Sequence, residues 1–352
     1  MKALVKRSLA AGDAALETWR IPEPGPGEVL IKVHAAGICG TDLKVYRAHY
    51  HKYQPPLVMG HELCGTVAKR GPGTDGLGLG APVTARIQVT SCGQCRACLT
   101  GRDNLCAAKT RIGFEYDGAF AEYIKVRREQ VYLLPPDLDL TAAVLTEAAA
   151  VIIHGLRPVN IKPTDVALVV GPGPIGLLAA IFVKAAGATV AVAGTVRDRA
   201  RLSLAEELGA DLIMLADDEA DQGLQKLLAM TKGEGPDIVL ECSGTTAGVN
   251  QCLNLCRAAG QFAQIGTRSE PVNVDFMKIA YKELTVTGTI DHVPIDWEDA
   301  IQFLRQHQAR FSPLLQSVYP IERWREAFRA AEEGQVGKVI LSFYNESKNE
   351  NK

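Results

Sequence analysis

Residues 166–187, VALVVGPGPIGLLAAIFVKAAG, decide the fold of this chain. An apolar run precedes the turn GPGPIG, and an apolar segment of helical composition follows it. A lone G-x-G-x-x-G pattern is weak, but a strand before it and a helix after it are typical of a dinucleotide-binding turn. We expect Gly171 to make the turn, Gly173 to let a pyrophosphate approach, and Gly176 to let the helix pack on the strand. The helix that opens at Pro174 and Ile175 would offer unpaired N–H groups to the phosphates, the alternative being a Gly-rich turn that binds nothing.

The choice of cofactor depends on the end of the second predicted strand. An acidic residue there would bond the ribose 2′-hydroxyl of NAD and repel a 2′-phosphate. The chain has Gly194 and Thr195 at this point, and arginines follow at 197, 199 and 201. We expect use of both cofactors, NAD(P), or a preference for NADP, with Thr195 and either Arg197 or Arg199 as phosphate contacts. The alternative is that these arginines begin a solvated helix with Asp198 as its N-cap.

Short apolar runs alternate with helix-like segments from residue 165 onward. The runs are VALVV, ATVAVAG, DLIML, DIVLEC, QFAQIG and LTVTGT. Such a pattern predicts a parallel sheet covered by helices on both faces. We therefore expect a doubly wound α/β domain over residues 151–289, in which Gly266, at the end of the fifth run, is a further candidate for cofactor contact.

The remaining sequence has another pattern. The first half, up to Pro135, combines short β-like runs with Pro/Gly punctuation, so it is predicted to be mainly β. An Ala-rich helix is expected within residues 141–160. Residues 290–352 contain two amphipathic stretches, a last strand KVILSFY and a polar tail ESKNENK that should fray. We predict that they return to the first domain, which then comprises residues 1–150 plus 290–352.

Length and composition limit the possible functions. The chain has 352 residues, 47% apolar and 22% charged, with a net charge of −2. The length favours two domains, and the charge balance gives no reason to expect nucleic acid or an anionic membrane as a partner. There is no signal-peptide pattern and no apolar stretch of about 18 residues. We expect a cytoplasmic protein that acts on a small molecule.

A loop with four cysteines carries the most specific metal signal. Cys92, Cys95, Cys98 and Cys106 lie within the segment SCGQCRACLTGRDNLC. Four thiolates can close a tetrahedral zinc site with no open position, so we predict structural zinc. An iron–sulfur cluster shares the C-x2-C-x2-C opening, but the bacterial ferredoxin run closes with x3-C-P, whereas seven residues precede Cys106 here.

A second metal site is predicted in residues 34–66, HAAGICGTDLKVYRAHYHKYQPPLVMGHELCGT. This stretch brings Cys39, His61 and Glu62 together with Thr41 and Asp42. A thiolate and an imidazole suit zinc, and an open fourth position would let the metal act as a Lewis acid on an alcohol. The alternative is that Cys39 and His61 are ordinary core residues.

As a set, these motifs resemble those of the zinc-dependent medium-chain alcohol dehydrogenases over nearly the whole chain. GICGTD, GHE, the four-cysteine loop and Glu147 in LTEAAAVIIHG are similar to the branch that contains polyol (sorbitol) and threonine dehydrogenases. The resemblance implies a GroES-like catalytic domain, a Rossmann domain, and two zinc ions per chain. It also implies a hydride transfer between a secondary alcohol or polyol and NAD(P).

The resemblance also implies roles for single residues. Cys39 and His61 would bind the catalytic zinc, and either Glu62 or Glu147 would supply the carboxylate. Thr41 would relay the proton of the alcohol. Asp42 would accept the other ring N–H of His61.

Three features depart from the family pattern. Lys44 stands where a histidine often ends the proton relay, so His49, His51 or bulk water would have to finish the path, or Lys44 itself. Asp291-His292 replaces an Arg-Tyr pair that helps to hold polyols in sorbitol dehydrogenases. The segment LGLGAPV replaces the usual Gly-Asp-Arg-Val before the strand, a structural change without a functional meaning.

Two other functions remain open. An L-threonine 3-dehydrogenase is an alternative within the enzymes, and a nucleotide-binding protein without turnover is an alternative of another class. The sixth apolar run would form a sheet edge available for pairing, so a homodimer or homotetramer is expected.

Overall fold

The computed structural model describes residues 1–50, 52–218, 220–268, 270–334 and 337–343. Its chain divides into two compact units. Among the described residues, the first comprises those within 1–147, 293–333 and 338–343, and the second comprises those within 148–292 together with 334 and 337. The polar tail ESKNENK, which we expected to fray, lies outside the described residues.

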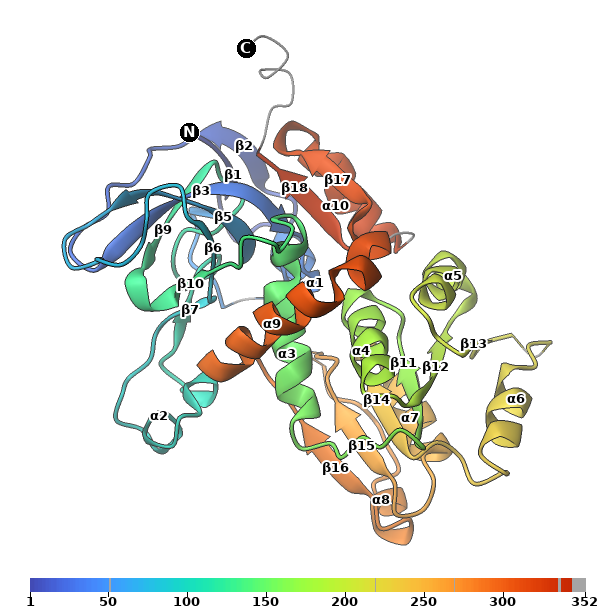
Figure 1. The fold of residues 1–352 in the computed structure, drawn as a ribbon. Coiled ribbons are helices and arrows are strands. Elements are labelled where there is room, and N and C mark those ends of the chain that lie inside the picture. Colours follow the sequence, from blue (N-terminus) through green and yellow to red (C-terminus); the bar gives the residue numbers. More distant parts are fainter. Residues whose placement is uncertain (51, 219, 269, 335–336, 344–352) are drawn as a thin grey trace. The chain divides into compact units, whose positions relative to one another are not determined.

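The second unit is built on a six-stranded parallel sheet (Figure 1). Its strands, in spatial order, are β13 (Leu212–Leu215), β12 (Thr189–Gly194), β11 (Val166–Val170), β14 (Ile238–Glu241), β15 (Gln261–Gln264) and β16 (Thr285–Gly288). Five helices connect them: α4 (Pro174–Ala185), α5 (Arg199–Glu207), α6 (Gly223–Met230), α7 (Thr246–Leu255) and α8 (Met277–Tyr281). The strand order reverses between β11 and β14, which creates the crevice where such sheets bind ligands.

This sheet confirms the prediction from the alternating apolar runs. Each of the six runs contains one of the strands. The central strands are the most deeply buried, since Leu168 on β11 and Val239 on β14 have no exposed surface. Fully apolar strands are expected where helices cover both faces of a parallel sheet.

The first unit is mainly β, as the Pro/Gly punctuation predicted. Its largest sheet has the order β10 (Val131–Leu133), β6 (Pro82–Ala85), β5 (Glu62–Arg70), β3 (Glu28–Gly37), β18 (Val339–Ser342) and β17 (Ser317–Pro320), with β9 (Tyr123–Arg127) also paired to β3. A smaller sheet has the order β2 (Ala14–Thr18), β1 (Lys2–Lys6) and β4 (Leu57–Val58), and β7 (Gln88–Thr90) pairs with β8 (Thr110–Arg111). The last strand, β18, pairs antiparallel with β3 and so joins the C-terminal part of the chain to the N-terminal sheet.

Four helices belong to the first unit: α1 (Gly40–Tyr46), α2 (Arg96–Leu99), α9 (Pro294–Phe311) and α10 (Trp324–Glu333). The last two are the predicted amphipathic stretches, and they bury Trp297 and Trp324 respectively. The Ala-rich helix is shorter than predicted, because α3 covers Thr146–Leu156 and a 3-10 turn at Ala142–Leu145 precedes it. No helix in the described ranges combines the length and apolar character that crossing a membrane requires.

Candidate metal and nucleotide sites

The short helix α1 positions the first predicted zinc ligand. Cys39 is its N-cap, and the backbone N–H of Cys39 donates a 2.8 Å hydrogen bond to Asp42 Oδ2. This capping interaction fixes the start of the helix, where the Asp42 side chain is buried. Thr41 Oγ1 lies 3.7 Å from Cys39 Sγ, so the hydroxyl and the thiol are neighbours.

His61 and Glu62, at the start of β5, complete a cluster with Cys39. The three potential ligand atoms lie within 4.8 Å of one another, and both His61 and Glu62 are buried. Asp42 Oδ1 lies 3.5 Å from His61 Nδ1, which orients the ring so that its other nitrogen is available. A thiolate, an imidazole and a carboxylate at this spacing suit zinc, and three protein ligands leave a fourth position open.

A buried lysine that the sequence analysis did not select lies beside this cluster. Lys338 Nζ forms an ion pair with Glu62 Oε2, and both side chains are buried to at least 97%. Burial, the largest single effect, would lower the pKa of Lys338, but the charge and hydrogen bond of Glu62 together with the charges of Cys39 and Glu147 raise it above its ordinary value, so the ammonium stays charged. Gly37 makes room for the pair, because a Cβ there would lie 2.6 Å from Lys338 Cε and would also clash with Glu62 Oε2.

Glu147 lies outside the three-residue cluster. It is buried in the first turn of α3. Its charge helps to raise the pKa of Lys338, but less than the charges of Glu62 and Cys39 do. The structure therefore groups Cys39 and His61 with Glu62 and not with Glu147.

The four-cysteine loop has the geometry of an all-sulfur zinc site. The Sγ atoms of Cys92 and Cys98 are 3.9 Å apart, and those of Cys95 and Cys98 are 3.5 Å apart. A tetrahedral site with Zn–S bonds of about 2.3 Å places its sulfurs about 3.8 Å apart, so the loop fits the metal. The group also includes Cys106, and no disulfide links any of the four.

The backbone of this loop favours a thiolate at Cys92. Hydrogen bonds from the N–H groups of Gln94 and Cys95 lower the pKa of the Cys92 thiol to about 6. Cys95 N lies 3.3 Å from Cys92 Sγ, and Cys92 N lies 3.4 Å from Cys106 Sγ. Such N–H···S bonds stabilise the deprotonated sulfurs that zinc requires.

The glycine-rich turn in the second unit leads from the end of β11 into α4. Gly171 has φ +97°, and Gly173 is the N-cap of α4, with Pro174 at the start of the helix. A Cβ on Gly176 would clash with the carbonyl oxygen of Gly171, whereas a Cβ on Gly173 would meet no atom within 4 Å. The position of Gly173 is therefore open to a ligand, and Gly176 is needed for packing of the helix on the strand.

The candidate contacts to a 2′-phosphate, Thr195, Arg197 and Arg199, directly follow β12. The backbone N–H and the hydroxyl of Thr195 both donate hydrogen bonds to Asp198 Oδ2, at 2.9 and 2.8 Å. Arg199 pairs with Asp218 at 3.2 Å, and Arg197 is exposed. Asp198 does stand at the N-cap position of α5, as the alternative interpretation had it, but its side chain makes no capping hydrogen bond to that helix.

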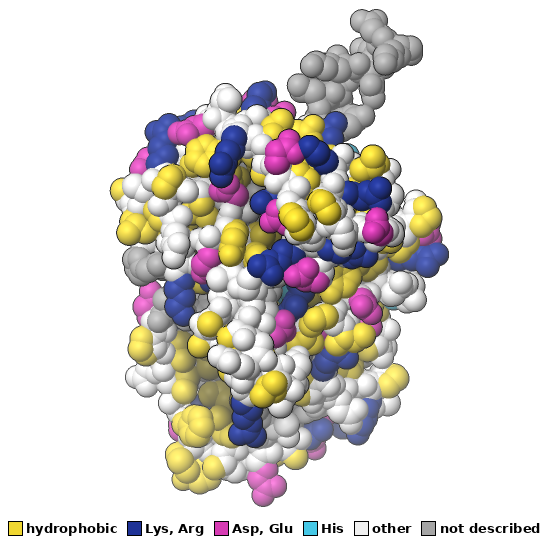
Figure 2. All heavy atoms as spheres, turned by 90° about the vertical axis from the view of Figure 1, so that its left-hand side faces the viewer, with side chains coloured by type: hydrophobic (Ala, Val, Ile, Leu, Met, Phe, Trp, Pro, Cys, Tyr) yellow, Lys and Arg dark blue, Asp and Glu magenta, His cyan; other side chains and the backbone are white. Residues whose placement is uncertain are grey.

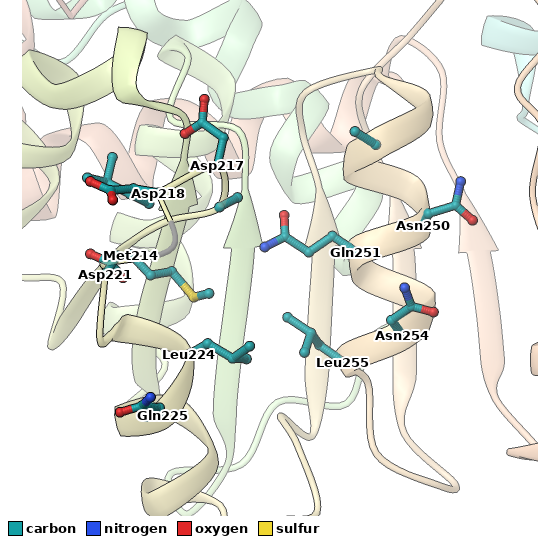
Figure 3. Close-up of a pocket in the computed structure, with 13 residues that line it drawn as sticks. Met214, Asp217, Asp218, Asp221, Leu224, Gln225, Asn250, Gln251, Asn254 and Leu255 are labelled. Atoms are coloured by element: carbon teal, nitrogen blue, oxygen red, sulfur yellow. The ribbon is translucent and has the colours of Figure 1, made fainter.

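A pocket of about 720 Å³ lies in the same unit, between α6 and α7 (Figure 3). Asp217, Asp218 and Asp221 line it from the loop after β13, and Gln251 and Asn254 line it from α7. It opens beside the carboxyl end of β13, the edge of the sheet where ligands bind in this class of fold.

Phe114, beside the cluster, and the remaining candidate histidines lie in different surroundings. Phe114 packs on His61 with ring centroids 5.3 Å apart, and the Arg111 guanidinium lies 4.4 Å from the centroid of the Phe114 ring. His292 is fully buried, whereas His49 is exposed. His51 lies outside the described residues.

Comparisons with known proteins identify the family. Residues 25–136 match the alcohol dehydrogenase GroES-like domain, and residues 174–306 match the zinc-binding dehydrogenases. A sorbitol dehydrogenase of Halalkalibacterium halodurans is 37% identical over 97% of this chain and 99% of its own length. An L-threonine 3-dehydrogenase of Bacillus subtilis is 34% identical, with 97% of this chain and 98% of the relative covered.

A similar solved structure indicates the same family as these relatives. It is described as a zinc-binding dehydrogenase from Sinorhizobium meliloti 1021 bound to NADP, and it matches 97% of this chain and 98% of its own with a TM-score of 0.87 and 30% identity. The resemblance seen in the motifs is thereby confirmed at the level of the whole chain. This protein belongs to the zinc-binding alcohol dehydrogenase family and is an oxidoreductase with a GroES-like and a Rossmann domain.

Proposed function

We propose that this enzyme transfers a hydride between a secondary alcohol or polyol and NAD(P), with one catalytic and one structural zinc per chain. The observation that supports it most is the buried cluster of Cys39, His61 and Glu62, which offers three ligands of the types zinc prefers. A zinc ion bound there supplies Lewis acidity toward the alcohol oxygen.

Within this proposal, Glu62 is the third ligand. Its carboxylate is in the cluster, and its Oε2 is held by Lys338, which leaves Oε1 for the metal. We place Glu147 as a second carboxylate near the site and outside the ligand set. Asp42 orients His61, and the hydroxyl of Thr41 accepts the proton of the alcohol and passes it on.

The proposed nucleotide site is the carboxyl edge of the second unit's sheet. Gly171, Gly173 and Gly176 form the turn for the pyrophosphate. Pro174 starts α4 and has no N–H, so the N–H groups of Ile175 and Gly176 in the first turn are those directed at it. Gly266, two residues after the end of β15, belongs to the same edge.

We further propose that NADP is used, with Arg197 as the principal phosphate contact. Arg197 is exposed beside the turn after β12, while Arg199 is engaged by Asp218 and the hydroxyl of Thr195 by Asp198. The NADP-bound relative supports this choice. In this arrangement the Asp198 carboxylate is close to the proposed position of the 2′-phosphate and repels it. The preference for NADP over NAD should therefore be modest.

L-threonine is the second candidate substrate. The Bacillus subtilis relative is an L-threonine 3-dehydrogenase with 34% identity, close to the 37% of the sorbitol dehydrogenase. Both substrates are secondary alcohols, so the same zinc chemistry serves either of them.

A homodimer or homotetramer in the cytoplasm completes the proposal. β16 pairs only with β15 among the described strands, and Phe276, Tyr281 and Val286 expose apolar surface on and beside it. All nine cysteines are unpaired, as expected for a reducing compartment. On the face that Figure 2 shows, basic and acidic side chains are interspersed, in keeping with a small-molecule substrate in place of nucleic acid.

The test is a substrate panel with the zinc-loaded enzyme. Polyols, diols, simple secondary alcohols and L-threonine are each offered with NAD and with NADP, and kcat/KM is measured for every pair. We expect turnover of at least one secondary alcohol, its loss on chelation of zinc, and its return when zinc is added. No turnover of any alcohol by protein that holds two zincs would contradict the proposal, and a kcat/KM ratio strongly in favour of NAD would contradict the NADP preference.

A further inference from the structure

Glu241 is a buried carboxylate without a basic partner at the centre of the second unit. It is the last residue of β14 and has no exposed surface. None of the ion pairs among the described residues includes it. A buried charge is costly unless hydrogen bonds satisfy it. Its retention therefore calls for donors and for a role.

Neighbouring loops supply these donors. The backbone N–H groups of Ser243 and Gly244 donate to the carboxylate at 2.9 and 3.0 Å, and the hydroxyl of Ser243 donates to it as well. Gln264, at the end of β15, donates through Nε2 at 2.6 Å. The carboxylate thus joins the segment after β14 to the end of the adjacent strand.

The backbone closes tightly around this side chain. A Cβ on Gly248 would lie 2.7 Å from Glu241 Oε1, and a Cβ on Gly266 would lie 2.7 Å from Glu241 Oε2. Only glycine permits this approach at either position. The N–H of Gly266 also donates to the main-chain oxygen of Glu241 at 2.7 Å.

The same network reaches the glycine-rich turn. Val170 and Glu241 are register partners on adjacent strands, so the carboxylate lies beside the start of that turn. A Cβ on Gly171 would lie 2.7 Å from the Cβ of Ser243, which means that the turn rests against the residue Glu241 holds. Ser243 Oγ in turn lies 2.8 Å from the hydroxyl of Thr245, the N-cap of α7.

We propose that Glu241 is a positioning residue for the dinucleotide, which fixes the segments after β11, β14 and β15 in the arrangement that binds it. This inference rests on the proposed nucleotide site. It adds to that site a residue that is not part of the glycine-rich motif. Glu241 would act through Ser243, Gly244 and Gly266 and would not touch the cofactor itself. An amide in its place would set its own NH2 group against donors that now need an acceptor.

The experiment compares Glu241→Gln with a matched control, Asp237→Asn. Asp237 immediately precedes β14 at its other end, where its carboxylate accepts the N–H of Val166 at 2.8 Å and pairs with Arg257 at 2.7 Å. Both changes replace a carboxylate that ties neighbouring segments together, but only Glu241 lies at the proposed cofactor edge. The readouts are the Kd for NADPH and NADH by fluorescence, the zinc content, the Tm, and kcat and KM for the nucleotide.

We expect Glu241→Gln to raise the nucleotide Kd and KM about tenfold or more, while the chain retains two zincs. Asp237→Asn should lower the Tm and leave the nucleotide Kd within about twofold of the wild type. If Glu241→Gln does not fold, Ser243→Ala, which removes only one of the donors, should raise the Kd about threefold or more.

Three results would overturn the inference: a wild-type Kd for folded Glu241→Gln, an equal loss of binding in Asp237→Asn, or, where Glu241→Gln does not fold, a wild-type Kd for Ser243→Ala. Failure of the wild-type enzyme to bind either nucleotide would instead overturn the proposed function. The two failures are therefore distinguishable.

Discussion

At the scale of single residues, the ammonium group of Lys338 explains how the Glu62 carboxylate can lie beside Cys39 in a buried site. Glu62, Cys39 and Glu147 all act on Lys338, which is the cation paired with Glu62. A buried pair contributes little net stability, but removing one partner leaves the other charge uncompensated. Lys338 therefore serves mainly to compensate the buried charge of Glu62 and to hold its carboxylate in place.

Replacing Lys338 by Met should destabilise the zinc-free chain by about 3–5 kcal/mol, the usual loss when one partner of a buried pair is removed. Zinc should restore part of this loss, because the metal would then compensate Glu62. Urea unfolding with and without zinc measures the difference. Lys69→Met is the control, since the Lys69–Glu23 pair has side chains 55% and 75% exposed and should change stability by less than about 1 kcal/mol. An equal loss with and without zinc would show that Glu62 does not face the metal.

Thr41 is the other residue whose role can be tested by itself. Thr41→Ala should lower kcat by about 10²-fold or more through loss of a proton-transfer group, with the nucleotide Kd unchanged. Thr41→Ser retains the hydroxyl and should retain most of the activity. A wild-type kcat for Thr41→Ala across the pH range would remove Thr41 from the relay.

At the scale of elements, the strands were predictable and the zinc cluster was only partly so. The apolar runs from VALVV to LTVTGT mark six strands because burial on both faces leaves few polar positions. Helix α1 escaped prediction, since seven residues are too few for a periodic pattern and its start depends on the bond between Cys39 and Asp42. Lys338 and Glu241 were not predicted either, because each is a single charged residue at one end of an apolar run. The partner of Lys338, Glu62, is distant in sequence, and a loop supplies donors to Glu241. A charged residue at the end of an apolar run could nevertheless have indicated such a role, since a charge next to a buried strand needs a partner.

The four-cysteine loop should behave as a separate structural element. Cys95→Ser should lose one zinc per chain and make the loop sensitive to protease, because the metal is what holds its short segments together. Nucleotide binding should persist. Cys252→Ala, which changes a fully buried thiol in α7, should retain both zincs. Two zincs in Cys95→Ser would contradict the assignment of this loop as a metal site.

The exposed edge strand β16 leads to a prediction about assembly. Val286→Glu, on β16, should weaken the proposed dimer, since a charge on an edge strand opposes strand pairing. Sedimentation of the variant should shift toward the monomer. Leu79→Glu is the control, because Leu79 is also exposed, at 66%, but belongs to the first unit. A monomeric wild-type enzyme would contradict the prediction outright.

At the scale of the whole molecule, the two units divide the chemistry. The first holds both groups of potential metal ligands that contain cysteine, and the second holds the glycine-rich turn and the network around Glu241. We expected one domain of residues 1–150 plus 290–352 and another of residues 151–289, because each motif is confined to one segment of the sequence. The sequence left Glu62 and Glu147 as alternatives for the third ligand, and the proposed choice of Glu62 rests on its place in the cluster with Cys39 and His61.

The most direct test of the account is zinc stoichiometry in Cys39→Ser, measured with nucleotide affinity and turnover. The wild type should hold two zincs per chain. Cys39→Ser should hold one, bind NAD(P) with an unchanged Kd, and show no hydride transfer. Two zincs with normal turnover in Cys39→Ser would contradict the proposed catalytic site, and parallel loss of nucleotide binding would contradict the separation of roles.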